Sequence, residues 1–319
     1  MNVGIIAIDN GLGHMRRQII IANYLSKFGC NVELLCNTEY VNKFDVSRKI
    51  NLVHFKIKVV DLINNDLVYQ KLSKIEYDKY DIFISDNIIE VLEFKPDAYI
   101  FANFFWHRSL NISKNYYKKS EKILNDYKPN IIANKYFAPL YVSQMKNTKL
   151  VGMFSNFKQE DNKLNLKKDI LISKGFGAAD DRYFDNLSLE VSHFANQWDC
   201  KVWVEPMLLK YFQGHRYCSA NYSSEMYASI KIALVRPGMG TISDLLGCGS
   251  KIFSFYEKSN NEMVHNAHVL SNFGHFDYAY DNLSKSLNKL YESSLETQEV
   301  NGFSFDGPKD TKRIIFNLI

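Results

Sequence analysis

The chain opens with a segment that predicts a strand, a tight turn and a helix in succession. Residues 3–17 read VGIIAIDNGLGHMRR, in which an apolar run at Val3–Ile8 precedes two glycines, Gly11 and Gly13, and an amphipathic stretch then covers His14–Phe28. Short apolar runs alternate with longer amphipathic stretches almost throughout the remaining chain, a pattern typical of α/β units around a parallel sheet. The sequence therefore predicts an α/β protein with doubly wound parallel sheets.

Composition narrows the class of protein further. The 319 residues are 46% hydrophobic and 23% charged, and at roughly 150 residues per domain this length predicts two domains. No apolar run reaches the roughly 18 residues of a membrane span, and the N-terminus lacks the basic region of a secretion signal. Five cysteines without a CxxC pair argue against a disulfide framework or a zinc site and favour the cytoplasm. No motif of nucleic-acid binding is present.

The first glycine turn has the character of an anion-binding and catalytic segment. Gly11 and Gly13 lie where a helix N-terminus offers unpaired backbone N–H groups. Arg16 occupies the place of the third glycine in a dinucleotide fingerprint, and no acid ends the next predicted strand, Asn31–Cys36, so an oxidoreductase is disfavoured. His14, in the first helical turn, is suited to act as a general base. The alternative is that His14 only caps the helix or lies on the surface.

A second glycine turn follows the predicted strand at residues 232–236. Residues 233–246 read ALVRPGMGTISDLL. Backbone N–H groups of such a turn can bind a pyrophosphate, and a carboxylate one helical turn later can accept both hydroxyls of a ribose. The candidate residues are Arg236, Gly238, Gly240, Thr241 and Asp244. The alternative is that Thr241 and Asp244 merely cap and charge-balance the helix.

Two further segments carry candidate binding residues. Glu262 and Asn266 are four residues apart in a predicted helix and share a face, so both can point at the hydroxyls of one ligand. Gly175 and Gly177 form a GxG turn after the strand predicted at Asp169–Ser173, which is weak evidence by itself.

These motifs resemble those of the glycosyltransferase-B superfamily. The GxGH turn, RPGxGTxSD and ExxxNA are similar in order and spacing to the lipid-linked N-acetylglucosamine transferase family of peptidoglycan synthesis. The stretch from Gly13 to Arg17 also resembles the UDP-sugar hydrolase of pseudaminic acid biosynthesis. The resemblance implies two Rossmann-like domains facing across a cleft. Residues 1–154 would bind the acceptor, with a helix at residues 308–319 packing back on them, and residues 155–307 would bind the nucleotide-sugar.

The resemblance also implies roles for individual residues. Asp244 would bind the ribose, where relatives usually have Glu, and the second glycine turn would bind the donor phosphates. Glu262 and Asn266 would contact the transferred sugar. His14 would deprotonate the acceptor hydroxyl and so give inversion at the anomeric carbon. The remaining implied donor-binding residues are Gly175, Gly177, Arg236 and, stacking on the nucleobase, Tyr222.

Two segments of the first half leave alternatives open. The cluster Phe104–Trp106 is either an acceptor platform or part of the core, and His107 and Asp86 rival His14 as the general base. Residues 114–128 carry five lysines in an amphipathic pattern, which fits either an anionic membrane surface or a solvated helix face.

The sequence therefore predicts a cytoplasmic, metal-independent inverting glycosyltransferase of bacterial polysaccharide biosynthesis, of the hexosyl or nonulosonate type. No Asp-x-Asp pair occurs in the chain, so backbone donors and helix dipoles would replace a metal ion at the diphosphate. The expected partners are a UDP-, CMP- or dTDP-linked sugar and a glycan or lipid-linked acceptor, with peripheral contact at the inner face of the membrane. The alternatives are a nucleotide-sugar hydrolase of the same fold and a non-catalytic nucleotide-sugar-binding protein.

Overall fold

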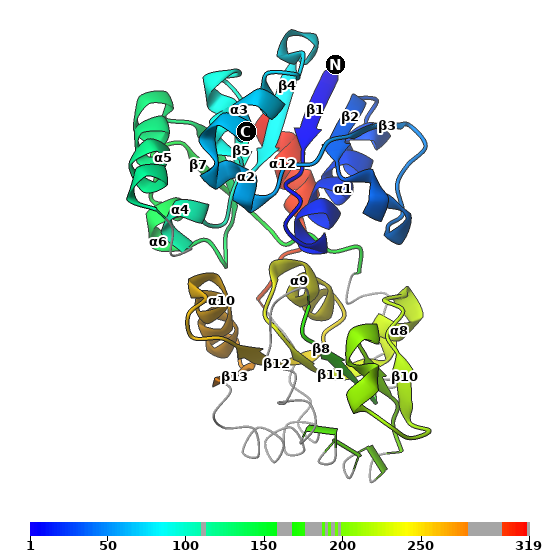
Figure 1. Ribbon diagram of the computed structural model, residues 1–319. Helices are drawn as coiled ribbons and strands as arrows, with labels where there is room; N and C mark the ends of the chain where they lie inside the picture. Colours follow the sequence, from blue (N-terminus) through cyan, green and yellow to red (C-terminus); the bar gives the residue numbers. More distant parts are fainter. Residues whose placement is uncertain are drawn as a thin grey trace. The chain divides into compact units, whose positions relative to one another are not determined.

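The computed structural model describes residues 1–109, 113–157, 168–175, 187–188, 191–192, 195–196, 199–279 and 302–317. The chain divides into two compact units (Figure 1): unit 1 comprises Met1–Phe154 and Asp306–Ile319, and unit 2 comprises Ser155–Phe305. The sequence also predicts a polar linker at residues 155–168 and a helix from about residue 182 to residue 197. Most of both segments lies outside the described residues.

Unit 1 is built on a seven-stranded sheet of order β3-β2-β1-β4-β5-β6-β7. All neighbouring strands run parallel. The apolar runs that predict these strands are Val3–Ile8, Asn31–Cys36, Leu52–Phe55, Ile82–Ser85, Ala98–Phe101, Asn130–Ala133 and Lys149–Gly152. Each strand coincides with its run within two residues at either end. The strands are β1 (Asn2–Ile6), β2 (Asn31–Cys36), β3 (Ile50–His54), β4 (Ile82–Asp86), β5 (Tyr99–Phe101), β6 (Asn130–Asn134) and β7 (Thr148–Val151). The strand order reverses its direction between β1 and β4, and such a switch point is where open α/β sheets bind ligands.

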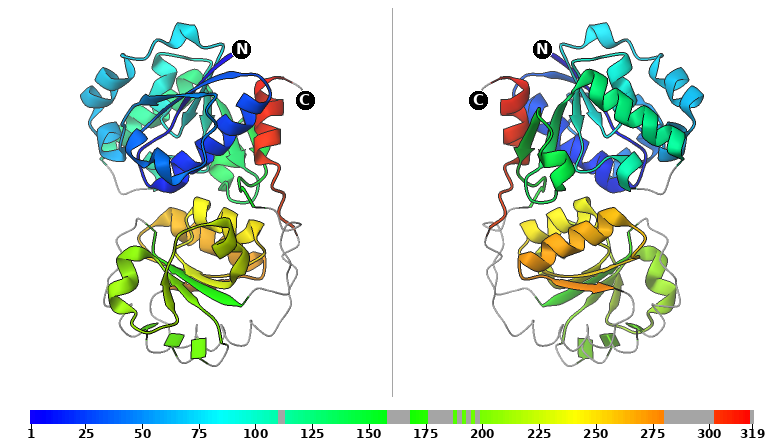
Figure 2. Two further views of the ribbon diagram at one scale, coloured as in Figure 1. Left: turned by 90° about the vertical axis from the view of Figure 1, so that its right-hand side faces the viewer. Right: turned by 90° about the vertical axis from the view of Figure 1, so that its left-hand side faces the viewer.

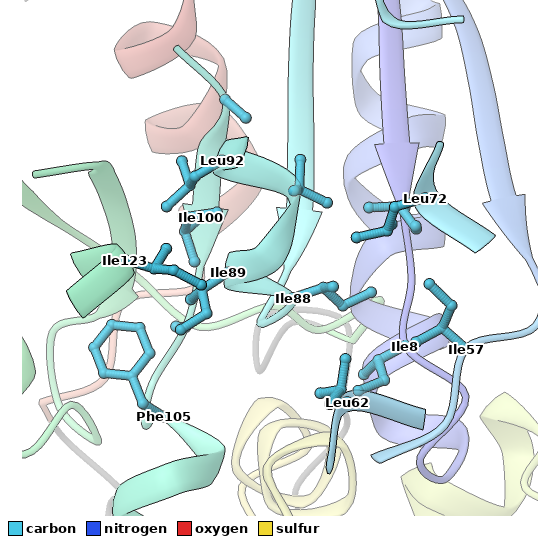
Figure 3. Packing of buried hydrophobic residues seen from close by; sticks show 14 of the residues in the cluster. Ile8, Ile57, Leu62, Leu72, Ile88, Ile89, Leu92, Ile100, Phe105 and Ile123 are labelled. Atoms are coloured by element: carbon cyan, nitrogen blue, oxygen red, sulfur yellow. The ribbon is translucent and has the colours of Figure 1, made fainter. Parts of the chain in front are cut away.

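The core of unit 1 has two layers, one on each face of this sheet. Along the apolar run that contains β1, Val3 and Ile5 belong to one buried cluster, whereas Ile6 and Ile8 belong to the other. This alternation follows from the two-residue period of a strand and explains why the apolar run is continuous. Figure 3 shows part of the second cluster, in which Ile8 packs near Ile57 and Leu62.

Helices and 3-10 turns connect the strands of unit 1. They are α1 (Leu12–Lys27), η1 (Thr38–Lys43), α2 (Val59–Ile63), α3 (Asn65–Leu72), η2 (Tyr77–Lys79), η3 (Ile89–Glu93), α4 (Trp106–Ser109), α5 (Lys114–Tyr127), α6 (Leu140–Ser143) and α12 (Gly307–Ile315).

The last helix, α12, returns to unit 1 after the whole of unit 2. It packs against α1 and β7 (Figure 2), and the Gly152 N–H donates to the Asp310 carboxylate at 3.1 Å. Gly307 at its start leaves no room for a side chain, because a Cβ there would lie 2.7 Å from the carbonyl oxygens of Gly152 and Met153. The helix therefore fits this place on the sheet closely.

Unit 2 has a six-stranded parallel sheet of order β10-β9-β8-β11-β12-β13. Its strands are β8 (Asp169–Ser173), β9 (Val202–Val204), β10 (Tyr217–Ser219), β11 (Ile230–Val235), β12 (Lys251–Tyr256) and β13 (Phe276–Ala279), and its described helices are η6 (Pro206–Tyr211), α8 (Ser224–Ser229), α9 (Met239–Gly247) and α10 (Asn261–Asn272). The short β13 has no apolar run to predict it. Helices α9 and α10 cover one face of the sheet (Figure 2).

Candidate functional site

The switch point of unit 1 brings together two side chains that are 72 residues apart. Asp86 is the last residue of β4, and His14 lies in the first turn of α1, which follows the adjacent β1. His14 Nδ1 lies 3.2 Å from both oxygens of the Asp86 carboxylate. Asp86 is fully buried, whereas the His14 side chain is 14% exposed. The two thus form a histidine–carboxylate pair whose imidazole retains access to solvent.

The glycines before His14 shape the turn that places it. Gly11 has a φ of 82°, in the left-handed region that a glycine adopts without strain, and it precedes α1 without any side-chain cap. Gly13 lies in the first turn of the helix. Both glycines sit at the predicted strand-to-helix junction.

A third residue, Arg17, completes the cluster. Its guanidinium donates to Asp86 Oδ1, and Nη2 lies 3.4 Å from His14 Nδ1. Burial by itself raises the pKa of Asp86, but the charges of Arg17 and His14 outweigh it and hold that pKa below its ordinary value. Asp86 is therefore a carboxylate near neutral pH, and Nδ1–H of His14 can donate to it while Nε2 keeps its lone pair.

Aromatic rings of the predicted cluster form the wall beside His14. The ring centroids of Trp106 and Phe104 lie 5.6 Å and 6.5 Å from that of His14, and the two rings meet edge to face at 4.8 Å. Both are almost fully buried. The structure therefore supports their role as core residues that support His14.

His107, expected as a rival base, is buried and contacts a residue of α5. Its side chain is 1% exposed, and Nε2 lies 2.7 Å from the Glu121 carboxylate, which also binds Arg108 Nε at 2.7 Å. Burial lowers the pKa of His107, against the opposing effect of Glu121. These contacts belong to an ion-pair network between α4 and α5. Asp86, the other residue expected as a rival base, is likewise fully buried, and its carboxylate contacts His14 and Arg17.

In unit 2, α9 begins at the second predicted turn. Gly238 precedes the helix without a side-chain cap, and a Cβ placed there would meet no atom within 4 Å. Gly240 and Thr241 lie in the first turn of α9. The N–H of Arg236 donates to the Ser173 carbonyl at 3.2 Å, which joins the turn to β8 at the switch point of this sheet. A helix N-terminus of this kind is able to bind an anion through its backbone N–H groups.

The polar side chains around α9 make internal contacts. Asp244 is 3% exposed and accepts a hydrogen bond from Ser155 Oγ at 3.0 Å. Asn266, on α10, is 2% exposed, and its Nδ2 donates to the Pro237 carbonyl at 2.9 Å. Asn266, expected to point at a ligand beside Glu262, thus contacts the second glycine turn, and its contact with a ligand stays a prediction. Glu262 is half-buried in the first turn of α10.

Glu205 is a polar residue at the carboxyl edge of the sheet that sequence reasoning missed. Its carboxylate accepts from Ser173 Oγ at 2.8 Å and from the Gly175 N–H at 2.9 Å. Burial, with a smaller contribution from the Glu205 charge, raises the pKa of Tyr222 to about 12. The only sequence signal was the acid directly after β9. Gly177 lies outside the described residues.

Two absences concern the described part of the chain. None of its helices is both long enough and apolar enough to cross a membrane. No group of three or more His, Cys, Asp or Glu side chains is arranged there to bind a metal ion.

Comparison with solved structures defines the class of fold. The chain is similar to the kitacinnamycin glycotransferase, with a TM-score of 0.68 and 10% identity over 100% of this chain and 99% of that one. It is similar to the calicheamicin glycosyltransferase CalG4 with a TM-score of 0.66 and 10% identity over 99% of this chain and 97% of that one. It is also similar to Arabidopsis thaliana UGT89C1 complexed with UDP, with a TM-score of 0.64 and 10% identity over 99% of each chain. No protein family and no curated protein sequence matches the chain.

The predicted fold class is thereby confirmed. The chain has two parallel-sheet α/β units and the glycosyltransferase-B fold. The finer resemblance to the peptidoglycan and pseudaminic acid enzymes stays a prediction.

Proposed function

We propose that the protein is a glycosyltransferase that inverts the anomeric configuration, with His14 as its general base. The observation that carries the proposal is the His14–Asp86 pair at the switch point of unit 1. The comparisons support it at the level of fold, since two of the solved structures that this chain resembles are named as a glycotransferase and a glycosyltransferase.

In the proposed reaction, His14 Nε2 removes the proton from an acceptor hydroxyl. The oxygen attacks the anomeric carbon of the nucleotide-linked sugar as the bond from that carbon to the leaving phosphate oxygen breaks. The proton stays on His14, and the ionised Asp86 stabilises the imidazolium and fixes its tautomer. Attack opposite to the leaving group inverts the configuration.

Unit 2 would bind the donor. The N-terminus of α9 at Gly238 would hold the phosphates through backbone N–H groups, in place of a metal ion, and Tyr222 would stack on the nucleobase. Asp244 would exchange its Ser155 partner for a ribose hydroxyl. We expect no resident cofactor.

The acceptor would be a bacterial cell-surface glycan or a glycolipid met on the cytoplasmic side of the membrane. The exposed face of α5 supports this setting, because Lys114, Lys118 and Lys122 are exposed along it. Tyr117 on the same helix is 43% exposed. Such a basic face is attracted to anionic lipids.

The test compares wild type, His14→Ala and His54→Ala with a panel of UDP-, CMP- and dTDP-sugars. His54 is an exposed histidine of the same unit whose Nδ1 pairs with Thr38, so it controls for histidine loss. We expect His14→Ala to lower turnover by about 10²–10⁴-fold with nucleotide affinity nearly unchanged. Equal turnover of the two variants would refute His14 as the base.

The same assay separates the two alternatives. Sugar release from donor alone, at a rate that acceptor does not increase, would identify a nucleotide-sugar hydrolase. Binding of a nucleotide-sugar, seen as a thermal shift, without turnover under either condition would identify a binding protein.

A further inference from the structure

Arg236 lies at the carboxyl edge of the unit 2 sheet, where β11 passes into the second glycine turn. It directly follows β11 and comes two residues before Gly238, which precedes α9. Its N–H donates to the Ser173 carbonyl at 3.2 Å, and its own carbonyl accepts from the Gly238 N–H at 2.8 Å. Asn266 Nδ2 donates to the next carbonyl, that of Pro237, at 2.9 Å. The backbone that carries the Arg236 side chain is therefore held by hydrogen bonds to β8 and α10.

The guanidinium of Arg236 differs from other arginine side chains of this protein in its surroundings. Arg17, Arg108 and Arg216 each pair with a carboxylate. Over the described part of the chain, no carboxylate pairs with Arg236, which is half-buried, and its Nε is buried without a hydrogen-bond partner. A buried N–H of a charged group that lacks a partner costs free energy. The side chain is therefore suited to an anion that the protein itself does not supply.

The start of α9 adds further donors beside Arg236. The first turn of α9 contains no acidic residue, and Gly238 provides no side-chain cap. A Cβ at Gly238 would meet no atom within 4 Å, so there is open space in front of the turn. The first turn of a helix has N–H groups without intrahelical partners and a positive dipole end. One turn of the chain thus combines a fixed positive charge with a helix N-terminus.

This combination matches one class of sugar donor better than another. A sugar linked through a nucleoside diphosphate carries one negative charge on each of two phosphates. A sugar linked through a nucleoside monophosphate carries one charge on a single phosphate. A helix N-terminus can bind one phosphate, and a guanidinium can bind a second through two parallel hydrogen bonds. When the bond to the anomeric carbon breaks, its electron pair stays on the phosphate oxygen, so the need for a nearby cation increases.

We propose that Arg236 is a specificity-determining residue that pairs with the sugar-bearing phosphate of a nucleoside diphosphate donor. The assignment rests on the proposed function, which puts the donor in unit 2. Of the UDP-, dTDP- and CMP-linked sugars that the sequence leaves open, it selects the UDP- and dTDP-linked ones. It also selects a hexosyl donor over a nonulosonate donor, since nonulosonates are carried on a nucleoside monophosphate.

The test measures nucleotide affinities of the full-length protein by isothermal titration calorimetry. The probes are pairs that share a base, namely UDP with UMP, dTDP with dTMP, and CDP with CMP, so that the ratio of the two Kd values reports the second phosphate alone. In wild type we expect the diphosphate of the preferred base to bind more tightly than its monophosphate by about tenfold or more. Arg236→Gln should weaken diphosphate binding about 10–100-fold and change monophosphate binding less than about threefold, because one charged hydrogen-bond partner is lost.

Two further variants serve as controls for this loss. Arg236→Lys retains the charge without the planar fork and should restore part of the diphosphate preference. Arg216→Gln removes an arginine of the same unit that already pairs with Asp199, and it should leave every nucleotide affinity near the wild-type value.

The melting temperature without nucleotide separates ligand binding from a structural role. Because Arg236 has no carboxylate partner among the described residues, Arg236→Gln should melt at or above the wild-type temperature and lose the stabilisation that the diphosphate gives to wild type. A variant that unfolds or melts lower, an equal loss for diphosphate and monophosphate, or equal wild-type affinity within every pair would overturn the proposal. A diphosphate preference without any sugar transfer would refute the proposed function and leave this assignment standing. Transfer from a CMP-linked sugar would overturn this assignment and leave the transferase intact.

Discussion

Asp86→Asn tests how strongly the stability of unit 1 depends on the buried charge that Asp86 places beside His14 and Arg17. The substitution conserves shape but removes the negative charge that faces both Arg17 and His14. The Arg17 side chain, which is 11% exposed, would then keep a nearly buried charge without its counter-charge. Removing one partner of a buried ion pair typically costs 3–5 kcal/mol. Because Asn can still accept one hydrogen bond, we expect about 3 kcal/mol, or roughly 6–12 °C in the melting of a unit of this size.

The loss of stability in Asp86→Asn should also depend on pH in a defined direction. The folded-state pKa of Asp86 is lowered, so its contribution to stability is present above the unfolded-state pKa of about 3.9. That contribution disappears as the pH falls through the lower folded-state value. The difference in the free energy of unfolding between wild type and Asp86→Asn should therefore be largest at pH 7 and decrease progressively below about pH 4.

Calorimetry at several pH values measures both the loss of stability and its dependence on pH. Turnover of Asp86→Asn should also fall, by about 10²–10⁴-fold, because the imidazole loses the group that orients it. Asp81→Asn is the matched control, since Asp81 lies directly before the same strand, is exposed, and accepts the Asn2 N–H at 2.7 Å. Equal melting temperatures of the two variants at pH 7 would refute a buried, charge-dependent cluster.

Three further substitutions test two sites in unit 1 and the C-terminal end of α9 in unit 2. Burial raises the pKa of Glu90 from 4.5 to about 7, so its destabilising effect grows as pH rises between those values. Glu90→Gln should be stabilising by about 3 kcal/mol at pH 8 and nearly neutral at pH 4 in urea unfolding. Gly4→Ala would place a Cβ 2.6 Å from the Phe83 ring and should cost about 1–3 kcal/mol, measured as a lower urea midpoint. Gly247→Ala would place a Cβ 2.7 Å from Ser155 Oγ, and calorimetry should show a similar loss. An unchanged stability of Glu90→Gln at pH 8 would contradict the burial of that carboxyl group, and an unchanged stability of either glycine variant would contradict the packing described.

The sequence predicts the sheets well because each buried strand is a short apolar run. In unit 1 all seven strands are predicted, and the glycine turns place His14 and Gly238 at strand-to-helix junctions as the structure has them. β13, only four residues long and interrupted by Asp277, carries too weak a pattern to be recognised.

The partners of the polar residues are what the sequence does not reveal. Asp86 meets His14 only because β1 and β4 are neighbours, a fact of topology that local patterns do not contain. His107 and Asn266 have residue types suited to a site, yet packing turns both inward. Arg17 and Glu205 were missed for the converse reason: their importance lies in contacts with residues distant in sequence.

The return of α12 to unit 1 has a consequence for biosynthesis. Because unit 2 is inserted before α12, the surface of α1 and β7 that this helix covers stays open while the intervening residues are being translated. Unit 1 can therefore collapse early on the ribosome but reaches its final packing only after unit 2 has been synthesised. Truncation before Asp306 would expose the apolar cluster to which Ile314 and Ile315 belong. Quality-control proteases and chaperones recognise such apolar surfaces in unfinished chains.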